Sequence, residues 1–416
     1  MTEQGPGRRD FPEAVDGGHV RRVCVVGSGW HFYSGISLYT CRLTNSLADT
    51  CATSAILMRR LLPRRLYPGA ARVGRQVSTA RYRDDVTVFD GVDYWGLPSL
   101  WRAVNFLRKV RPDVLVLQWW TGAVLHSYLV LALVARISGF RIVLEMHETQ
   151  DTGEARHRLA RWYVERGLRL LLLLTGAVVV HSEFDRARLR RYPAFRARPV
   201  HVIPHGPYDH LRAKTSALSQ PEPPDRPDPG EFCYLYFGTI RPYKGVEYLI
   251  EAFNGLEAGE VAQRRLIVVG ETWEKWERPA QLIEASPHRD RITFVNRYVH
   301  DTEVAAYFAR ADAVILPYLR SSASGPLHMA MSQGLPVAVS GVGGLVEAAR
   351  EYRGTTFIRP GDVEGIRAAL RSLPAHPRRR YPDPHDWSKN VAAFHKVFDL
   401  VTAGADPAPV RAGQPH

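Results

Sequence analysis

The stretch FGTIRPYKGVEYLIEAFNGL (Phe237–Leu256) decides the fold of this chain. An apolar run ends at Gly238, a short turn carries Arg241 and Lys244, and a helical pattern begins after Gly245. A turn from a strand into a helix presents backbone N–H groups that attract anions, arginine can fork two phosphate oxygens, and lysine adds a point charge. The pattern predicts a phosphate site on an α/β domain, with a glycine turn bearing two solvated cations as the alternative.

A second segment of the same kind follows, LPYLRSSASGPLHMAMSQGLPVAVSGVGGLVEAA (Leu316–Ala349). Its apolar start leads into a Ser/Gly loop, and Gly325 opens a helical pattern. Ser324 and Gly325 would present a hydroxyl and an N–H group to an anion at the helix start. A further run of glycines makes a tight loop before Glu347. Two such turns in one domain favour phosphate binding more strongly than either alone.

Outward from these segments, short apolar runs alternate with helical periodicity along the chain, which is typical of parallel sheets with crossover helices. The 416 residues suffice for two α/β domains of roughly 180 residues each. The stretch SQPEPPDRPDPGE is typical of an exposed linker between them. The predicted parts are a disordered tail at 1–19, a first domain at 20–209, a linker at 210–230, a second domain at 231–385, a last helix at 386–403 and a disordered tail at 404–416.

The expected strands are short and rich in β-branched residues. In the first domain they are Arg22–Val26, Thr53–Met58, Val86–Phe89, Val114–Gln118, Arg141–Glu145, Ala177–His181 and Val200–Ile203. In the second domain they are Phe232–Phe237, Leu266–Val269, Ile292–Phe294, Ala313–Leu316 and Pro336–Val339.

The order of strand, cationic turn, strand, Ser/Gly loop, Gly-x-Pro-Val and Gly-Gly-x-x-Glu resembles the C-terminal domain of family 4 retaining glycosyltransferases. That family has the GT-B fold, so the resemblance implies two Rossmann-like domains with parallel sheets facing across a cleft. In the family the cationic turn holds the donor diphosphate, which here implies Arg241 and Lys244 as donor-binding and catalytic residues. The other donor contacts that the resemblance implies in this domain are Gly238, Ser324, Gly325 and Glu347.

One departure concerns two glutamates that the family usually carries eight positions apart. Alignment on the Gly-Leu-Pro turn places Ser321 and Met329 there, and neither side chain can act as a carboxylate. The chain resembles a bacterial subgroup that lacks the pair, and we interpret the departure as altered donor contacts.

The first domain opens with VVGSGWHFYSGISLYTCRL (Val25–Leu43), a strand, a glycine-bearing loop and a helix. Phe32 stands where a dinucleotide fingerprint requires its third glycine, so NAD is disfavoured. Gly35 instead resembles the family's first-strand loop, which faces the donor phosphate and the acceptor.

His147 follows a strand, where side chains at the carboxyl edge of a parallel sheet face the crevice. The resemblance implies a catalytic place beside the reacting sugar, and the residues alone equally allow a loop histidine bonded to Glu148 or to solvent. The IPHG turn resembles the family's interdomain crossover, and we expect a structural role for His205.

No metal site is expected. The sequence has no Asp-x-Asp, and His201, His205 and His210 lack the spacing that metals demand. Arg241 and Lys244 can neutralise the leaving diphosphate without a divalent ion. The nucleotide sugar is then a co-substrate, and no cofactor is predicted.

The chain is basic, with 55 Lys and Arg against 42 Asp and Glu. A basic surface suits phosphorylated substrates or an anionic membrane, and a GC-rich genome is the alternative source of so much arginine. The segments Met58–Arg75 and Ala155–Leu174 interleave Arg with Leu, Trp or Tyr, as membrane-surface segments and ordinary basic helices both do. Nucleic acid is disfavoured, because no recognition-helix, zinc-finger or ribonucleoprotein pattern is present.

The expected location is the cytoplasm, with peripheral contact to the inner face of the membrane as the finer alternative. The four cysteines form no CxxC pair, and the first residues lack the apolar core of a signal peptide. The apolar run Leu170–Val180 is much shorter than the ~20 residues that span a bilayer.

The predicted function is transfer of a sugar from a UDP- or GDP-linked donor to a hydroxyl acceptor, with retention at the anomeric carbon implied by the resemblance. A lipid-linked or cell-envelope glycan, as in exopolysaccharide assembly, is the favoured acceptor, and a small natural product is the alternative. A nucleotide-sugar 2-epimerase and a non-catalytic scaffold that binds sugar nucleotides or membranes are the rival functions.

Overall fold

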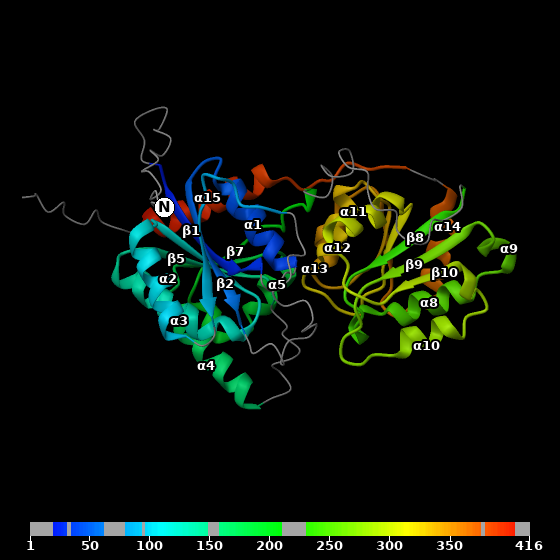
Figure 1. Cartoon of the computed structure of the whole chain (residues 1–416), viewed down its shortest axis with the longest axis horizontal. Helices are drawn as coiled ribbons and strands as arrows, with labels where there is room; N and C mark the ends of the chain where they lie inside the picture. The colour runs from blue at the N-terminus through cyan, green and yellow to red at the C-terminus, as the bar shows by residue number, and fades with distance from the viewer. Residues whose placement is uncertain are drawn as a thin grey trace, which may run out of the picture.

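The structure, a computed structural model, describes residues 20–30, 35–61, 80–93, 96–148, 158–209, 230–375 and 379–403. Within these ranges the chain forms two parallel sheets, each with helices on both faces (Figure 1). The prediction of two Rossmann-like α/β domains is confirmed. The predicted tails, most of the linker and most of the basic segment Met58–Arg75 lie outside the described residues.

The first sheet has seven parallel strands in the order β3-β2-β1-β4-β5-β6-β7. Its strands are β1 (Arg22–Ser28), β2 (Ala52–Arg60), β3 (Thr87–Asp93), β4 (Val114–Trp119), β5 (Arg141–Met146), β6 (Ala177–Val180) and β7 (Val200–Val202). The helices are α1 (Gly35–Leu47), α2 (Leu97–Val110), α3 (Leu125–Ile137), α4 (Arg158–Leu174), α5 (Glu183–Leu189) and α6 (Pro193–Arg196), with a 3-10 turn at Gly122–Val124. Every residue of the central β4 is buried, as expected for a strand covered on both faces.

The second sheet has six parallel strands in the order β10-β9-β8-β11-β12-β13. Its strands are β8 (Phe232–Phe237), β9 (Arg264–Val269), β10 (Ile292–Val295), β11 (Ala313–Leu316), β12 (Val337–Ser340) and β13 (Thr355–Ile358). The helices are α8 (Val246–Asn254), α9 (Ala258–Val261), α10 (Arg278–Glu284), α11 (Asp301–Arg310), α12 (Gly325–Ser332), α13 (Gly344–Arg350) and α14 (Val363–Ser372). Sequence patterning missed β13, because only Ile358 of this edge strand is buried.

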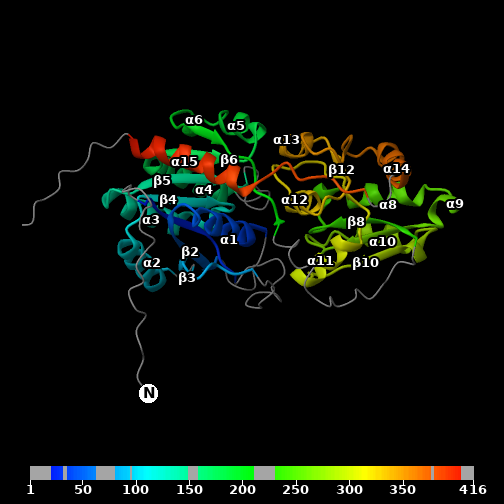
Figure 2. The same cartoon turned by 90° about the horizontal axis from the view of Figure 1, so that it is seen from above.

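The last helix, α15 (Trp387–Ala403), returns to the first domain after the second sheet is complete. Its apolar residues Trp387, Phe394 and Phe398 pack with Val23 and Val25 of β1. Figure 2 shows α15 lying along the first sheet, with the chain before it crossing from the second domain. The first sheet is therefore covered by α1 and α15 on one face and by α2, α3 and α4 on the other.

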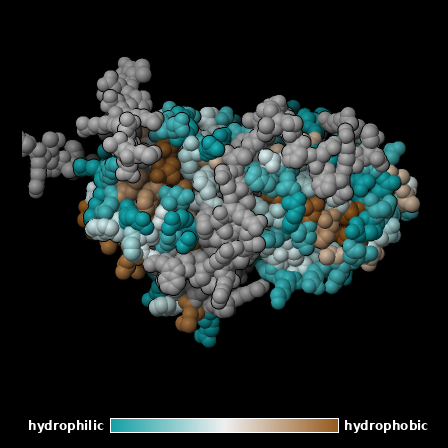
Figure 3. Space-filling view, in the orientation of Figure 1, coloured by the Kyte–Doolittle hydropathy of each residue, from teal (hydrophilic) through white to brown (hydrophobic). Residues whose placement is uncertain are grey.

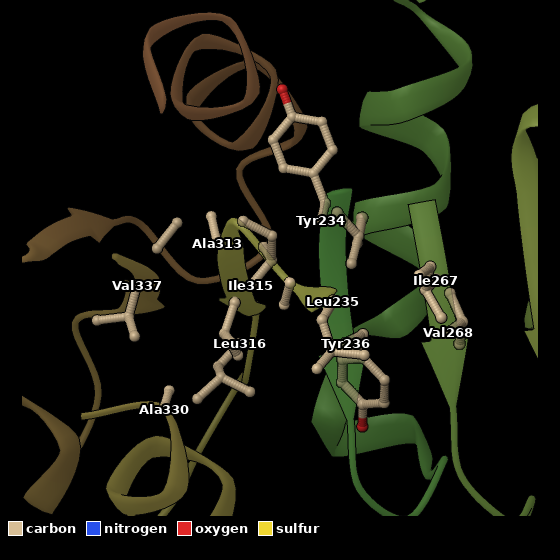
Figure 4. Packing of buried hydrophobic residues seen from close by; sticks show 14 of the residues in the cluster. Tyr234, Leu235, Tyr236, Ile267, Val268, Ala313, Ile315, Leu316, Ala330 and Val337 are labelled. Carbon is tan, nitrogen blue, oxygen red and sulfur yellow. The ribbon is translucent and has the colours of Figure 1, made fainter. Parts of the chain in front are cut away.

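The core of the second domain lies on both faces of its sheet. Figure 4 shows Tyr234 and Tyr236, two residues apart on β8 and so on the same face of the sheet, with their rings extending toward opposite ends of the strand. The Tyr234 hydroxyl donates to the carbonyl of Leu370 on α14, and the Tyr236 hydroxyl donates to the carbonyl of Thr239, 3.0 Å away. These bonds satisfy buried phenols whose rings fill the core.

Candidate active site

Three of the predicted donor-binding residues gather around Tyr318, just after β11. The Lys244 ammonium lies 3.6 Å from the centre of the Tyr318 ring, and the Ser324 hydroxyl lies 3.4 Å from the Tyr318 hydroxyl. A Cβ atom added to Gly238 would come within 3.9 Å of the same hydroxyl. The two turns that the sequence predicted therefore meet on one buried aromatic ring.

The cationic turn keeps its shape because of Gly245, at a φ of 63°. A Cβ atom there would lie 2.1 Å from the carbonyl oxygen of Pro317, so a larger residue fits neither the backbone nor the space. The carbonyl of Tyr243 accepts a 2.9 Å hydrogen bond from the amide of Leu319. The two turns are thus joined through their backbones.

Arg241 precedes that turn and is held by a carboxylate of its own domain. Its Nε donates to Glu274 at 2.8 Å, and its guanidinium lies 5.1 Å from the Tyr243 ring centre and 5.6 Å from that of Trp273. The Tyr243 ring is also 5.2 Å from the Lys244 ammonium. Arg320 lies 4.8 Å from the same ring centre, so three cations surround one ring, an arrangement that suits the binding of an anion.

The electrostatics of Lys244 set it apart from a surface lysine. Burial lowers its pKa to about 7, although the nearby carboxylate of Glu148 acts in the opposite direction. Glu148 belongs to the first domain and directly follows His147. Lys244 of the second domain is thus within electrostatic reach of Glu148, which directly follows His147 in the first domain.

Tyr208, on the crossover between the domains, joins the two predicted glycines Gly35 and Gly325. Its hydroxyl donates to the carbonyl of Gly35 at 3.0 Å. Cβ atoms on Gly35 and Gly325 would come within 3.3 and 3.5 Å of that hydroxyl oxygen. The starts of α1 and α12 approach each other across this one side chain.

Glu347 is placed differently from the other predicted donor contacts. Its carboxylate accepts hydrogen bonds from the backbone amides of Glu183 at 2.6 Å and Phe184 at 2.8 Å. Both amides belong to the first turn of α5 in the first domain, where an acidic group is favoured. In this structure Glu347 therefore joins the two domains.

His147 lies at the end of β5 with its ring nitrogens turned inward. Its Nδ1 lies 3.1 Å from His181 Nε2, and its Nε2 lies 3.6 Å from Glu145. His181 Nδ1 faces the carbonyl of Ile203 at 3.0 Å and must carry a proton, so its Nε2 accepts from His147. The buried side chains of His181 and Glu145 therefore set the orientation of the His147 ring.

Glu145 is the buried carboxylate next to His147 and His181. It accepts hydrogen bonds from the hydroxyl of Tyr39 at 2.7 Å and from the amide of Gln118 at 2.9 Å. Burial acts to raise its pKa, but the neighbouring His147 and His181 rings and the hydrogen bond from Tyr39 lower the pKa overall. Glu145, His147 and His181 are also a set that could hold a metal ion, since one ligand atom of each lies within 4.8 Å of the others. Of these three side chains only His147 and His181 are hydrogen-bonded to each other, and the buried His147 Nε2, 3.6 Å from Glu145, has no hydrogen-bond partner among the described residues.

The positions of the usual glutamate pair offer no carboxylate, as the sequence indicated. The Ser321 hydroxyl donates to the carbonyl of Ala323 at 2.8 Å, inside its own loop. Met329 is part of the core of the second domain.

Sequence reasoning missed Tyr318, Tyr208, Glu274 and His181. Tyr318 and His181 each come just after a strand, at the sheet edge that already carried the predicted residues, and this position was the available signal. Tyr208 and Glu274 lie on loops that carry no such signal.

A cavity of about 1140 Å³ lies between the domains, on the side of the two crossovers. Its walls include Arg42 of α1, Gln333 beyond α12, and Asp383 and His385 of the returning chain. None of the predicted donor-binding residues lines it.

Comparison with known proteins places both domains. Residues 231–376 match the family described as glycosyl transferases group 1, and residues 34–206 match the glycosyl transferase 4-like domain. Over 285 residues the chain is 30% identical to the GDP-mannose:glycolipid 4-beta-D-mannosyltransferase of Xanthomonas campestris pv. campestris, covering 66% of this chain and 73% of that protein. This chain belongs to the family 4 glycosyltransferases.

The glycosyltransferase is also similar, at 25% identity over 80% of its length and 81% of the relative, to the 2-deoxystreptamine N-acetyl-D-glucosaminyltransferase of Streptomyces fradiae. Its fold is that of Anabaena HepE, solved in complex with UDP, with a TM-score of 0.56 at 17% identity over 92% of this chain and 97% of that one. The predicted class of enzyme, a nucleotide-sugar-dependent glycosyltransferase, is thereby confirmed. Among the described residues, no helix is long and apolar enough to cross a membrane.

Proposed function

We propose that this glycosyltransferase binds the diphosphate of a UDP- or GDP-linked sugar at the paired turns around Tyr318 and transfers the sugar to a hydroxyl of a lipid-linked or envelope glycan. The observation that carries the proposal is the buried Lys244, held against Tyr318 and within reach of Glu148 of the other domain. A buried ammonium with lowered pKa gains most from an anionic ligand.

Arg241 and Lys244 would stabilise the charge that develops on the leaving diphosphate. The Ser324 hydroxyl accepts from the amide of Leu327 and caps α12, and the amide of Gly325 at the start of this helix would add to the same anion site. His147 would border the sugar, with its ring fixed by Glu145 and His181. Retention at the anomeric carbon rests on the family resemblance, and the anomeric proton coupling in the NMR spectrum of the product tests it.

Catalysis without a metal ion is part of this proposal, since two cations already serve the diphosphate. Full activity after extensive dialysis against EDTA, with no metal in the protein by mass spectrometry, is the expected result. Lost activity that Zn²⁺, Mg²⁺ or Mn²⁺ restores would contradict it and would direct attention to Glu145, His147 and His181.

A thermal-shift and hydrolysis screen of UDP-, GDP- and dTDP-sugars tests the donor site. We expect one nucleotide class to raise the melting temperature of the wild type, with slow release of its sugar, and to have no effect on Arg241→Ala/Lys244→Ala. Arg278→Ala/Arg297→Ala removes two exposed cations of the same domain and is the matched control. Equal shifts in both double variants would contradict this site.

The helices α2, α3 and α4 of the first domain support the membrane side of the proposal. They carry large apolar side chains on their outer faces, and Trp101 and Trp162 are 61% and 59% exposed. The other exposed apolar residues there are Leu97, Val130, Leu133, Ile137, Leu159, Tyr163, Leu170 and Leu173. Figure 3 shows apolar atoms at the lower left, the region of these helices in Figure 1.

Exposed basic residues alternate with this apolar surface, namely Arg102, Arg108, Lys109, Arg136, Arg158, Arg161, Arg166 and Arg169. Interfacial tryptophans with flanking arginines suit an anionic lipid surface. Since α2 and α4 follow strands of a parallel sheet, Trp101 and Trp162, near the helix starts, lie toward the edge that carries His147. A lipid-linked acceptor would thus reach the site from the membrane.

Vesicle flotation tests the membrane contact. We expect binding to vesicles of phosphatidylglycerol and phosphatidylcholine at low salt, little binding to phosphatidylcholine alone, and loss of binding in Trp101→Ser/Trp162→Ser. Leu400→Ser, on the opposite face of the first sheet, is the control. Binding unchanged by the tryptophan substitutions would contradict this surface.

A small natural product is the second candidate acceptor, favoured by the similarity to the 2-deoxystreptamine transferase over most of the chain. Transfer to a free aminocyclitol in the absence of vesicles would establish it.

A further inference from the structure

Five histidines form a continuous column through the junction of the two domains. The ring centres of His147 and His181 are 4.6 Å apart, and those of His181 and His205 are 5.3 Å apart. His205 and His328 follow at 4.8 Å, and His328 and His385 at 4.9 Å. The rings of His205 and His328 are stacked, with 24° between their planes.

The column crosses from one domain to the other at that stacked pair. His205 belongs to the crossover that follows β7 in the first domain, whereas His328 belongs to α12 of the second. His385 lies on the chain that returns to α15. The two places where the chain passes between the domains are thus linked by aromatic contact.

The bonding and burial of the column favour neutral rings. His205 Nδ1 faces the carbonyl of Gly206 at 2.9 Å, and so carries the proton of a neutral imidazole. Burial, followed by the neighbouring histidines, holds the pKa of His205 well below its usual value. Burial and the charge of His385 lower the pKa of His328 to about 3, against a smaller opposite effect of Asp383.

The groups that face the stacked pair come from several elements. His205 is surrounded by Tyr39 of α1, 4.3 Å away between ring centres, by Tyr208, and by His147 and His181. The tyrosine rings around His205 carry no negative charge that would stabilise a proton on its imidazole.

His328 faces His205, His385 and Asp383. The carboxylate of Asp383 is already bonded to Ser332 at 2.9 Å and to His385 at 3.0 Å. A proton on either ring of the stacked pair would therefore place a cation among imidazoles, with this one shared carboxylate nearby.

We propose that the stacked His205 and His328 form a proton-sensitive joint, so that the two domains hold this arrangement only while both rings are neutral. If the domains separate, both rings reach water and regain a pKa near ~6.5. Because the pKa of each ring is lower in the joined state than in the separated state, the joined state loses stability as the pH falls below ~6.5. Asp383 and His385 line the cavity between the crossovers, which gives protons a route to the column.

The joint goes beyond glycosyl transfer and does not depend on which donor binds. It does regulate the site, because Gly35 and Gly325 meet through Tyr208, the neighbour of His205 in the stack. Acidification would separate the turns of the two domains and stop transfer while each domain stays folded.

Small-angle scattering of the full chain from pH 7.5 to 5.0, with far-UV circular dichroism on the same samples, tests the joint. We expect the radius of gyration of the wild type to increase below pH 6.5 at constant helix content. His205→Phe/His328→Phe keeps aromatic contact without a titrating group and should keep the pH 7.5 radius throughout. His126→Phe, on the outer side of α3, should behave like the wild type.

If the double phenylalanine variant is misfolded at pH 7.5, His205→Gln/His328→Gln replaces it with two polar, uncharged side chains, with the same expected insensitivity. A constant wild-type radius at pH 5.0 would overturn the proposal, as would expansion of the uncharged variants at the wild-type midpoint. The experiment uses no donor, so its result is separate from that of the nucleotide screen.

Discussion

The carboxylate of Glu347, on the second domain, accepts a 2.8 Å hydrogen bond from the backbone amide of Phe184, on the first. The family resemblance implies that Glu347 contacts the donor. In this structure its carboxylate instead binds the first backbone amides of α5. One carboxylate cannot serve both partners at full strength, so a donor contact of Glu347 would compete with the α5 contact.

We predict that Glu347→Ala raises the donor KM by about tenfold or more, because one hydrogen bond to a charged group is lost. Steady-state kinetics with the donor varied measure it. Glu351→Ala, at the end of the same helix, is the control. An unchanged donor KM would assign Glu347 to the α5 contact alone.

If Lys244 binds the diphosphate as proposed, its lowered pKa gives donor binding a pH dependence. Its pKa of about 7 rises when the diphosphate binds, so binding takes up a proton above pH 7. We predict that donor affinity falls by about tenfold per pH unit above 7, until the pKa of the bound state is reached. Isothermal titration calorimetry with the nucleoside diphosphate from pH 6 to 9 measures the slope.

Lys244→Arg separates proton uptake from other effects of pH on donor binding, because its guanidinium stays charged throughout this range. Its affinity should change little between pH 7 and 9. The same slope in Lys244→Arg as in the wild type would show that another group takes up the proton.

The fold could be read from the sequence because both sheets are parallel and buried. Every residue of β4 is buried, so the strand is a continuous apolar run that patterning detects. The edge strand β13 and the docking of α15 on the first domain escaped prediction, because they depend on contacts between distant parts of the chain. Periodicity shows that α15 has an apolar face but does not show that β1 covers it.

The site was predictable where chemistry is local. Lys244, Ser324 and Gly238 lie on turns whose residue types already indicate an anion, and the structure places all three near Tyr318. The partners of His147 and Glu347 were not predictable, since His181 and α5 approach them only through tertiary packing.

Tyr318 should act through its ring more than through its hydroxyl. Tyr318→Phe keeps the face against which Lys244 rests, and we predict a donor Kd within about threefold of the wild type. Tyr318→Leu removes the cation–π contact, which is worth up to ~2 kcal/mol when desolvated, so its Kd should rise by about tenfold or more. Calorimetry at pH 6.5 compares the two variants, and a larger loss of donor affinity in Tyr318→Phe than in Tyr318→Leu would contradict the role of the ring.

Gly206 and Trp387 lock the last helix onto the first domain. A Cβ atom on Gly206 would lie 2.5 to 2.7 Å from three ring atoms of Trp387, which is buried and donates from its indole N–H to the carbonyl of Pro207 at 3.0 Å. A rigid ring cannot yield as a flexible side chain would. We therefore predict that Gly206→Ala costs roughly 1–3 kcal/mol of unfolding free energy, measured by urea denaturation.

A double-mutant cycle assigns that cost to the contact. Trp387→Leu is destabilising by itself, but adding Gly206→Ala to it should cost clearly less than adding it to the wild type. Gly259→Ala is the matched control, because a Cβ atom there meets nothing within 4 Å. Equal costs of Gly206→Ala in both backgrounds would place the strain in the crossover backbone, and α15 would then be free to tolerate smaller residues at 387.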